Sequence, residues 1–185
     1  MVETPDQKIA DLLVDYGFDM EAGESNDLYI NVKDLKDITA FKDMKIPDLI
    51  RPLSYASPIE FRFFLQEYGE RVDEGPLFDI KSLPMDWYDP DVSCICIDDE
   101  GIDAAFLVRF DGNDTVIAEL LAGLGDDSSK KLPYLLAYAA TNALYTYTQK
   151  TKIIIRRRNK SIMKLADKIL NGKKGEKVYR GILME

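Results

Sequence analysis

The stretch from Asp114 to Leu170 constrains the fold more than any other part of the chain. A β-branched, apolar run from Asp114 to Ala122 ends at Gly123-Leu124-Gly125 and is followed by a polar loop. A run rich in Leu, Ala and Tyr then predicts a buried helix over residues 132–147, and residues 153–155 predict a buried strand. A strand–helix–strand unit of this kind makes its two strands parallel, with the helix packed on the sheet.

The residues around this unit predict the rest of the sheet. Apolar runs at Val92–Asp98, at Ile102–Phe110 and from Thr115 onward favour strands, and turn sequences separate them. A closing strand is predicted from Glu176 to Met184. The predicted fold class is therefore α/β, a mixed sheet in which an antiparallel meander is followed by a β-α-β crossover.

Two amphipathic helices are predicted before the meander. Thr4-Pro5-Asp6-Gln7 is typical of a helix start with Thr4 as the cap, and Ser57-Pro58-Ile59-Glu60 is a capping box. The side chains predicted to face the core are Ile9, Leu12, Leu13 and Tyr16 in the first helix and Ile59, Phe63, Phe64 and Tyr68 in the second.

We predict two parts in the chain. Residues 1–35 form an N-terminal helix–strand appendage, and residues 36–185 form the main domain. The first helix and the strand at Leu28 resemble the unit that closes the chain. Residues 1–35 are therefore either a remnant of a preceding, related half or an unrelated short amphipathic helix with its strand.

The composition excludes several kinds of site. The chain has no histidine, which rules out His-based triads and His-bearing zinc sites. The two cysteines, Cys94 and Cys96, share one face of a predicted strand, so we expect core packing and no metal site. Without a long apolar run or a charged-then-apolar leader, we expect a cytoplasmic location and no membrane contact.

The charge is unevenly distributed. The net charge is −9, yet half of the 24 basic residues lie between Lys150 and Arg180. This pattern fits a solvated, ion-paired surface or a local anion site for a phosphorylated ligand. A nucleic-acid partner is disfavoured because no aromatic residues flank Arg156-Arg157-Arg158.

The element order from Val92 onward carries a family resemblance. Together with Gly123-Leu124-Gly125, the Ala/Leu helix and Asn159-Lys160-Ser161-Ile162-Met163-Lys164-Leu165 before Gly172, it resembles the GNAT superfamily of acyl-CoA-dependent N-acyltransferases. The resemblance covers roughly residues 48–185. It implies that the strand carrying Glu119 and the strand at 153–155 splay apart, with acetyl-CoA lying between them.

The resemblance also implies which residues hold the cofactor. Leu120, Leu121 and Ala122 of the first strand line its pantetheine arm. The residues of the glycine turn and the helix start that face its phosphates are Gly123, Gly125, Ser128, Ser129, Lys130 and Lys131. Arg156 approaches from the second strand and Asn159 from the second helix.

Four positions depart from the family pattern. Asp126 and Asp127 place carboxylates near the implied pyrophosphate, and Ala166 stands where many members have a Tyr acid. Pro133 lacks an N–H, so we predict it at the first helical position, which lengthens the loop before the helix.

Glu119 is the implied general base. A lone carboxylate on an apolar strand needs an explanation, and the alternatives are a structural ion pair or an edge position that faces solvent. The function implied is transfer of an acetyl group from acetyl-CoA to a small-molecule or peptide amine. The alternative is a GNAT-like binding or regulatory module with lost or altered cofactor binding.

Overall fold

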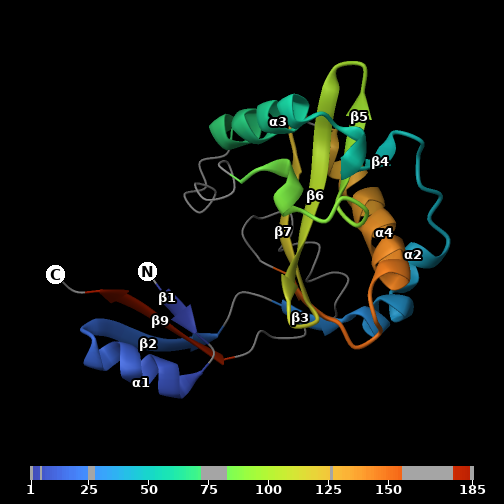
Figure 1. Cartoon of the computed structure of the whole chain (residues 1–185). Coiled ribbons are helices and arrows are strands. Elements are labelled where there is room, and N and C mark those ends of the chain that lie inside the picture. The colour runs from blue at the N-terminus through green and yellow to red at the C-terminus, as the bar shows by residue number, and fades with distance from the viewer. Residues whose placement is uncertain are drawn as a thin grey trace.

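A computed structural model describes residues 2–4, 6–24, 28–71, 83–125, 127–155 and 177–183. Its larger part is a six-stranded sheet of order β3-β8-β7-β6-β5-β4 (Figure 1). The strands are β3 (Leu28–Asn31), β4 (Ile50–Pro52), β5 (Cys94–Asp98), β6 (Gly101–Gly112), β7 (Thr115–Gly123) and β8 (Lys152–Ile155).

The sheet has the predicted mixture of strand directions. β5, β6 and β7 pair as an antiparallel meander, whereas β7 and β8 are parallel and are joined through helix α4 (Ser128–Thr146). β3 and β4 pair antiparallel at the two ends of the strand order. This arrangement confirms the predicted antiparallel meander followed by a β-α-β crossover.

Among the described residues, helices α3 and α4 cover the two faces of this sheet. Helix α3 (Pro58–Arg71) packs its buried Phe64 against a cluster that includes Leu107 and Leu120. Helix α4 packs Leu135 against the opposite cluster, which includes Leu121. Figure 1 shows α3 and α4 on opposite sides of the sheet. The two clusters stabilise the sheet because they remove both of its apolar faces from water.

The capping box of α3 is confirmed, but the predicted core face of this helix is partly wrong. The Ser57 N–H donates to Glu60 Oε2 at 2.8 Å, and the Glu60 N–H donates to Ser57 Oγ at 3.2 Å. Phe61, Phe64, Leu65 and Tyr68 are the buried side chains, whereas Ile59 and Phe63 are exposed. The helix is therefore rotated so that Phe61 and Leu65 take the core positions predicted for Ile59 and Phe63.

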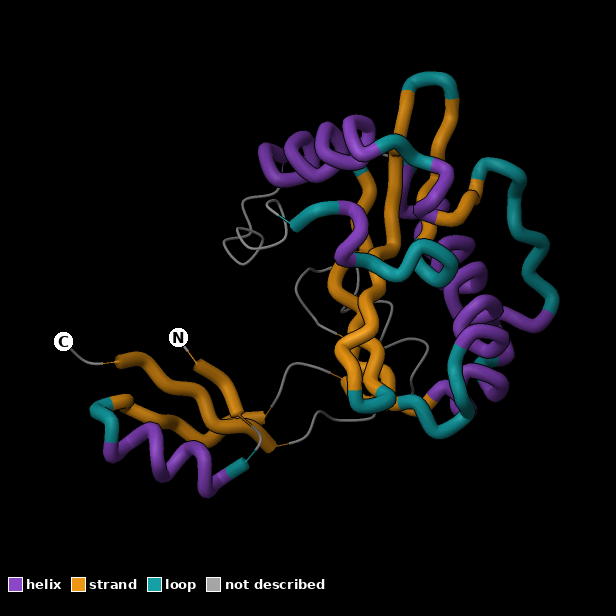
Figure 2. The backbone as a smooth tube through the Cα atoms, in the orientation of Figure 1, coloured by secondary structure: helices purple, strands orange, loops and turns teal. Residues whose placement is uncertain are grey.

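A second, three-stranded sheet contains both ends of the described chain (Figure 2). Its order is β1-β9-β2, all antiparallel, with α1 packed on it. The elements are β1 (Val2–Thr4), α1 (Gln7–Asp15), β2 (Phe18–Glu24) and β9 (Lys177–Leu183). β9 thus joins the N-terminal strands, whereas β3, which we predicted in the appendage, belongs to the main sheet. The division of the chain at residue 35 itself stays a prediction.

Two predicted helix starts are wrong. α1 is capped by Asp6 rather than Thr4, because the Asp6 side chain accepts from the Lys8 N–H at 2.8 Å. α4 begins at Ser128, so Pro133 lies inside the helix and not at its first position. A proline in its second turn removes one backbone bond, at a cost of roughly 3 kcal/mol for an interior site. The packing of Leu132 and Leu135 into the sheet offsets this loss.

Short elements connect the larger ones. These are the 3₁₀ helices η1 (Val32–Asp37), η2 (Leu53–Tyr55) and η5 (Met85–Trp87) and the helix α2 (Thr39–Lys42). Cys94 and Cys96 are buried and free, and the Cys94 Sγ lies 3.2 Å from the Leu135 carbonyl oxygen, which confirms core packing. Within the described residues, every helix is too short or too polar to cross a bilayer.

Candidate functional site

Among the described residues, the parallel pairing of β7 with β8 covers the first part of β7. The register runs from Thr115 opposite Lys152 to Ala118 opposite Ile155, where the described part of β8 ends. β7 continues to Gly123, and we call Glu119–Gly123 the β7 extension. Its other edge stays paired with β6, from Leu120 opposite Leu107 to Gly123 opposite Ala104.

A β-bulge marks the start of this extension. Along the β6–β7 pair, Leu120 lies opposite Leu107 and Ala118 lies opposite Val108, so Glu119 is an extra residue on β7. A bulge interrupts the regular ladder and bends the strand, and it often re-aims a side chain beside a functional site. The only acidic residue of β7 therefore stands where the strand geometry changes.

Glu119 forms a buried ion pair with Arg109. The Glu119 side chain is only 3% exposed, and the Arg109 Nε donates to its Oε1 at 2.8 Å. Arg109 also pairs with Asp111 and lies over the ring of Trp87, 5.8 Å from the ring centroid. Burial lowers the pKa of Arg109, but its bonds to Asp111 and Glu119 outweigh this, so the pKa is raised overall.

This pair decides between the structural alternatives for Glu119. The Glu119 side chain is buried, so a position facing solvent is wrong, and the ion pair is present. The role of general base stays a prediction. Sequence reasoning missed Arg109, because the register that places it opposite Ile117 and the bulge at Glu119 are known only from the structure. In that register Arg109 makes a diagonal contact with Glu119.

The Gly-Leu-Gly turn after β7 is held by two other elements. The Leu124 N–H donates to the Asp103 carbonyl at 2.8 Å, and Arg71 at the end of α3 donates to the Leu124 carbonyl at 2.6 Å. The Ser128 N–H then donates to the Gly125 carbonyl at 3.0 Å. These bonds lead the chain from the β7 extension directly into the first turn of α4.

Gly123 fits tightly against this first turn. A Cβ added at Gly123 would overlap the Cβ and Oγ of Ser128, which is itself buried. A residue without a side chain is therefore required at the end of β7 for α4 to begin where it does. The glycine permits close approach of the helix to the strand.

The two lysines at the start of α4 are both paired with carboxylates. Lys130 Nζ lies 2.6 Å from Asp127 Oδ1, in a pair whose side chains are each 78% exposed. Lys131 Nζ lies 2.7 Å from Asp103 Oδ2 in a less exposed pair. The hydrogen bond that Lys131 donates to Asp103 is the main cause that raises the pKa of Lys131. An exposed pair such as Lys130–Asp127 contributes about 0–1 kcal/mol, so its lysine exchanges partners easily.

The structure thus brings most of the predicted cofactor residues to one end of the sheet. Gly123, Gly125, Ser128, Ser129, Lys130 and Lys131 are consecutive or adjacent at the start of α4. Leu120, Leu121 and Ala122 are fully buried in the two core clusters, so only their backbone is placed to meet a ligand. Arg156, Asn159 and Ala166 lie outside the described residues, as does Asp126.

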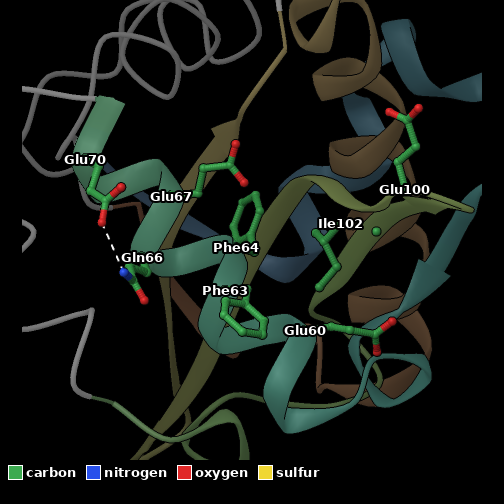
Figure 3. A pocket seen from close by; sticks show the side chains of 9 residues that line it. Glu60, Phe63, Phe64, Gln66, Glu67, Glu70, Glu100 and Ile102 are labelled. Atoms are coloured by element: carbon green, nitrogen blue, oxygen red, sulfur yellow. Dashed lines mark hydrogen bonds between the residues drawn. The ribbon is translucent and has the colours of Figure 1, made fainter.

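An acidic hollow of about 480 Å³ lies beside α3 (Figure 3). It lies between this helix and the β5–β6 turn, with Ile102 of β6 across from Phe63 and Phe64 of α3. The lining residues are Glu60, Phe63, Phe64, Gln66, Glu67, Glu70, Glu100, Gly101 and Ile102. All charged side chains among these described residues are carboxylates, so the hollow attracts cations.

The hollow and the β7 extension lie at the same end of the sheet. Ile102 is two residues along β6 from Ala104, which pairs with Gly123. The last turn of α3 carries Glu67 and Glu70, and Arg71 in that turn bonds the Leu124 carbonyl. Sequence reasoning missed this hollow because its carboxylates come from two segments far apart in the chain.

Comparison with known proteins adds evidence on the fold. No family model matches the sequence, and no curated protein matches it. The structure is similar to a GCN5-related N-acetyltransferase from Kribbella flavida, with a TM-score of 0.53 and 13% identity, over 95% of this chain and 63% of that chain.

A functionally unknown conserved protein from Staphylococcus epidermidis ATCC 12228 is similar to the same extent. Its TM-score is 0.52 at 12% identity, over 95% of this chain and 66% of that chain. The chain therefore spans about two thirds of the length of each of these proteins. At such low identity the likeness establishes the fold alone. The chain shares its mixed α/β fold with a GCN5-related N-acetyltransferase, as the sequence pattern predicted.

Proposed function

We propose that the chain is an acyl-CoA-dependent N-acyltransferase that transfers an acetyl group to an amine. One observation carries this proposal: β7, which pairs parallel with β8, leads through the Gly123-Leu124-Gly125 turn into the start of α4. A strand end next to a helix N-terminus suits a ligand with an extended amide-bearing arm and an anionic end. The backbone of Glu119–Gly123 would hold the arm, and the first turn of α4 would hold the phosphates.

The residues present fit such a ligand in most respects. The dipole of a 19-residue helix favours an anion at Ser128–Lys131, although the Ser128 and Lys130 N–H groups already donate to the Gly125 and Asp127 carbonyls. Lys130 exchanges its exposed partner Asp127 for a phosphate at little cost. When bound, acyl-CoA supplies an activated thioester. The chain itself positions the two reactants and, through backbone N–H groups near the bulge, stabilises negative charge on the acyl oxygen.

Glu119 is the proposed base. Its carboxylate stands at the bulge of β7, and Arg109 fixes its orientation. It would accept the proton of the attacking amine, directly or through water. The acidic hollow beside α3 supports a cationic acceptor, because its carboxylates raise the local concentration of amines at the same end of the sheet.

A second candidate is a GNAT-like module that does not transfer acyl groups. The ion pairs favour it, since Lys130, Lys131 and Glu119 each already have an oppositely charged partner. In this candidate the ion pairs serve stability, and α4 does not hold a pyrophosphate.

Ligand binding separates the two candidates. For the enzyme, acetyl-CoA and desulfo-CoA are expected to raise the melting temperature, with about 2.7 kcal/mol of stabilisation at a hundredfold excess over Kd. No shift at millimolar ligand would contradict the enzyme and favour the module. Binding without thiol release in the presence of a panel of amines would also favour the module.

A matched pair of substitutions locates the phosphates. Ser129→Glu places a carboxylate in the first turn of α4, where it stabilises the helix but repels a pyrophosphate. Thr141→Glu makes the same change about 18 Å further along the helix. We expect Ser129→Glu to weaken desulfo-CoA binding roughly tenfold or more and Thr141→Glu to leave it unchanged. Equal affinities for both variants would remove this helix start from the site.

Glu119→Gln tests the base. We expect kcat to fall roughly 100-fold or more, with desulfo-CoA affinity unchanged. A normal kcat would leave Glu119 with a structural role only.

A further inference from the structure

Helix α1 has an apolar stripe that the described structure leaves uncovered. Ile9, Leu12 and Tyr16 follow at helical spacings of three and four, and all are about half exposed or more, with Tyr16 at 72%. The residue of α1 that is buried against the three-stranded sheet is Ala10, and Leu13 beside it is half-buried. The stripe therefore lies next to the covered face of the helix and not within it.

The exposed stripe continues onto β9. Leu183 is also more than half exposed, and its Cδ1 lies 3.9 Å from where a Cβ of Gly17 would be. We call Ile9, Leu12, Tyr16 and Leu183 the α1 patch. The three clusters of buried apolar side chains found in the described part of the chain contain no residue of α1, β1, β2 or β9. An exposed, contiguous apolar patch of this kind is typical of an interaction surface.

The charges beside this patch identify its partner. Lys8 and Asp15 are exposed and seven residues apart, so they lie on the same flank of the stripe, at opposite ends of the helix; the exposed Asp11 lies on the same side of the helix but further from the stripe. When two identical helices pack antiparallel about a two-fold axis, each flank faces the same flank of the other helix in reverse order. Lys8 then meets Asp15 of the partner subunit, and Asp15 meets the partner's Lys8.

We propose that the α1 patch is a self-association surface that docks on the same patch of a second copy of this chain. The two α1 helices pack antiparallel, with Leu12 nearest the two-fold axis. Two copies of a chain with net charge −9 repel each other, so their contact is most favourable where opposite charges meet. The α1 flank is self-complementary in this sense. This proposal does not depend on the proposed function.

Sedimentation equilibrium of the whole chain over a range of concentrations tests the proposal. We expect a reversible change from 21.0 kDa to twice that mass. Leu12→Glu is expected to raise the dissociation constant at least tenfold. Leu49→Glu, an equally exposed apolar position at 47%, lies outside the patch and is expected to leave it unchanged. A monomer at every concentration, or open-ended assembly, would overturn the proposal.

A charge swap identifies the geometry. Lys8→Glu and Asp15→Lys are each expected to raise the dissociation constant roughly three- to tenfold, since each breaks two symmetry-related pairs. The double variant is expected to restore the original value. Additive losses in the double variant would exclude an antiparallel helix pair.

A cross-link gives an answer that does not depend on affinity. Leu12→Cys places one new thiol near the proposed axis, whereas the native cysteines are buried. Mild oxidation is expected to link two copies of this variant but not of Leu49→Cys. Equal cross-linking of both variants, or of neither, would overturn the proposal.

Discussion

The six-stranded and three-stranded sheets differ in what covers them. α3 and α4 lie on the two faces of the larger sheet, and buried side chains such as Leu107 and Leu135 join each helix to the strands. In the part of the chain that the structure describes, the helix on the smaller sheet is the short α1, whose described side chains are mostly exposed. Both regions contain amphipathic helices and alternating strands. The comparison teaches that an apolar stripe in a sequence predicts a surface to be covered, without saying what covers it.

The largest expected effect is the difference in unfolding free energy between a substitution in the larger sheet and one in α1. Leu107→Ala removes a fully buried side chain between α3 and the sheet and is expected to cost about 3–5 kcal/mol of unfolding free energy. Leu12→Ala, at 53% exposure, is expected to cost less than about 0.5 kcal/mol. Urea denaturation measures both, at a protein concentration low enough to exclude self-association. Equal losses of unfolding free energy in the two variants would show that the two regions do not differ in how well their apolar side chains are covered.

The buried ion pair gives the next largest effect. Arg109→Met leaves Glu119 buried without its guanidinium partner and is expected to cost about 2–3 kcal/mol, because the pair is not fully shielded from water. Lys130→Met opens an exposed pair and is expected to cost about 0–1 kcal/mol. Chemical denaturation of both variants measures the difference. If Lys130→Met costs as much as Arg109→Met, burial does not determine the strength of these pairs.

Gly123 tests the contact between β7 and α4. Gly123→Ala is expected to cost about 1–2 kcal/mol, because its Cβ would overlap Ser128. Adding Ser128→Gly removes the overlapping atoms, so the two changes are expected to be non-additive in a double-mutant cycle. Gly125→Ala is the control, since a Cβ there would meet only the Asp103 side chain at 3.0 Å. Strictly additive costs for Gly123 and Ser128 would show that the two residues do not press on each other.

The smallest effect concerns the helix caps. Hydrogen bonds from the side chain and then the backbone of Ser57 lower the pKa of Glu60 in the folded protein. Glu60 therefore stabilises α3 above the pKa of an unfolded glutamate, about 4.3, and this contribution is lost as the pH falls through its folded pKa. The stability difference between the native chain and Glu60→Gln should shrink between pH 6 and pH 3. Denaturation curves measure it, and a constant difference would contradict the prediction.

Much of the main sheet is predictable from the sequence. Local patterns predicted the meander, the crossover strand at 153–155 and the capping box at Ser57, because each depends on residues close together in the chain. The location of the candidate site at the end of β7 follows from the same unit. The Arg109–Glu119 pair and the acidic hollow were not predicted. The ion pair depends on the bulge at Glu119, and the hollow depends on side chains from separate segments of the chain.

The sequence by itself determined the order of strands and helices from Cys94 to Ile155 and the parallel crossover, since periodicity and turn residues act locally. Only the tertiary structure decided that β9 joins β1 and β2, that Pro133 lies inside α4, and that Ile59 and Phe63 remain exposed. Each of these outcomes depends on contacts between residues that are far apart in the sequence. Long-range packing outweighs local preference because burying apolar area contributes more free energy than a cap or a single backbone bond.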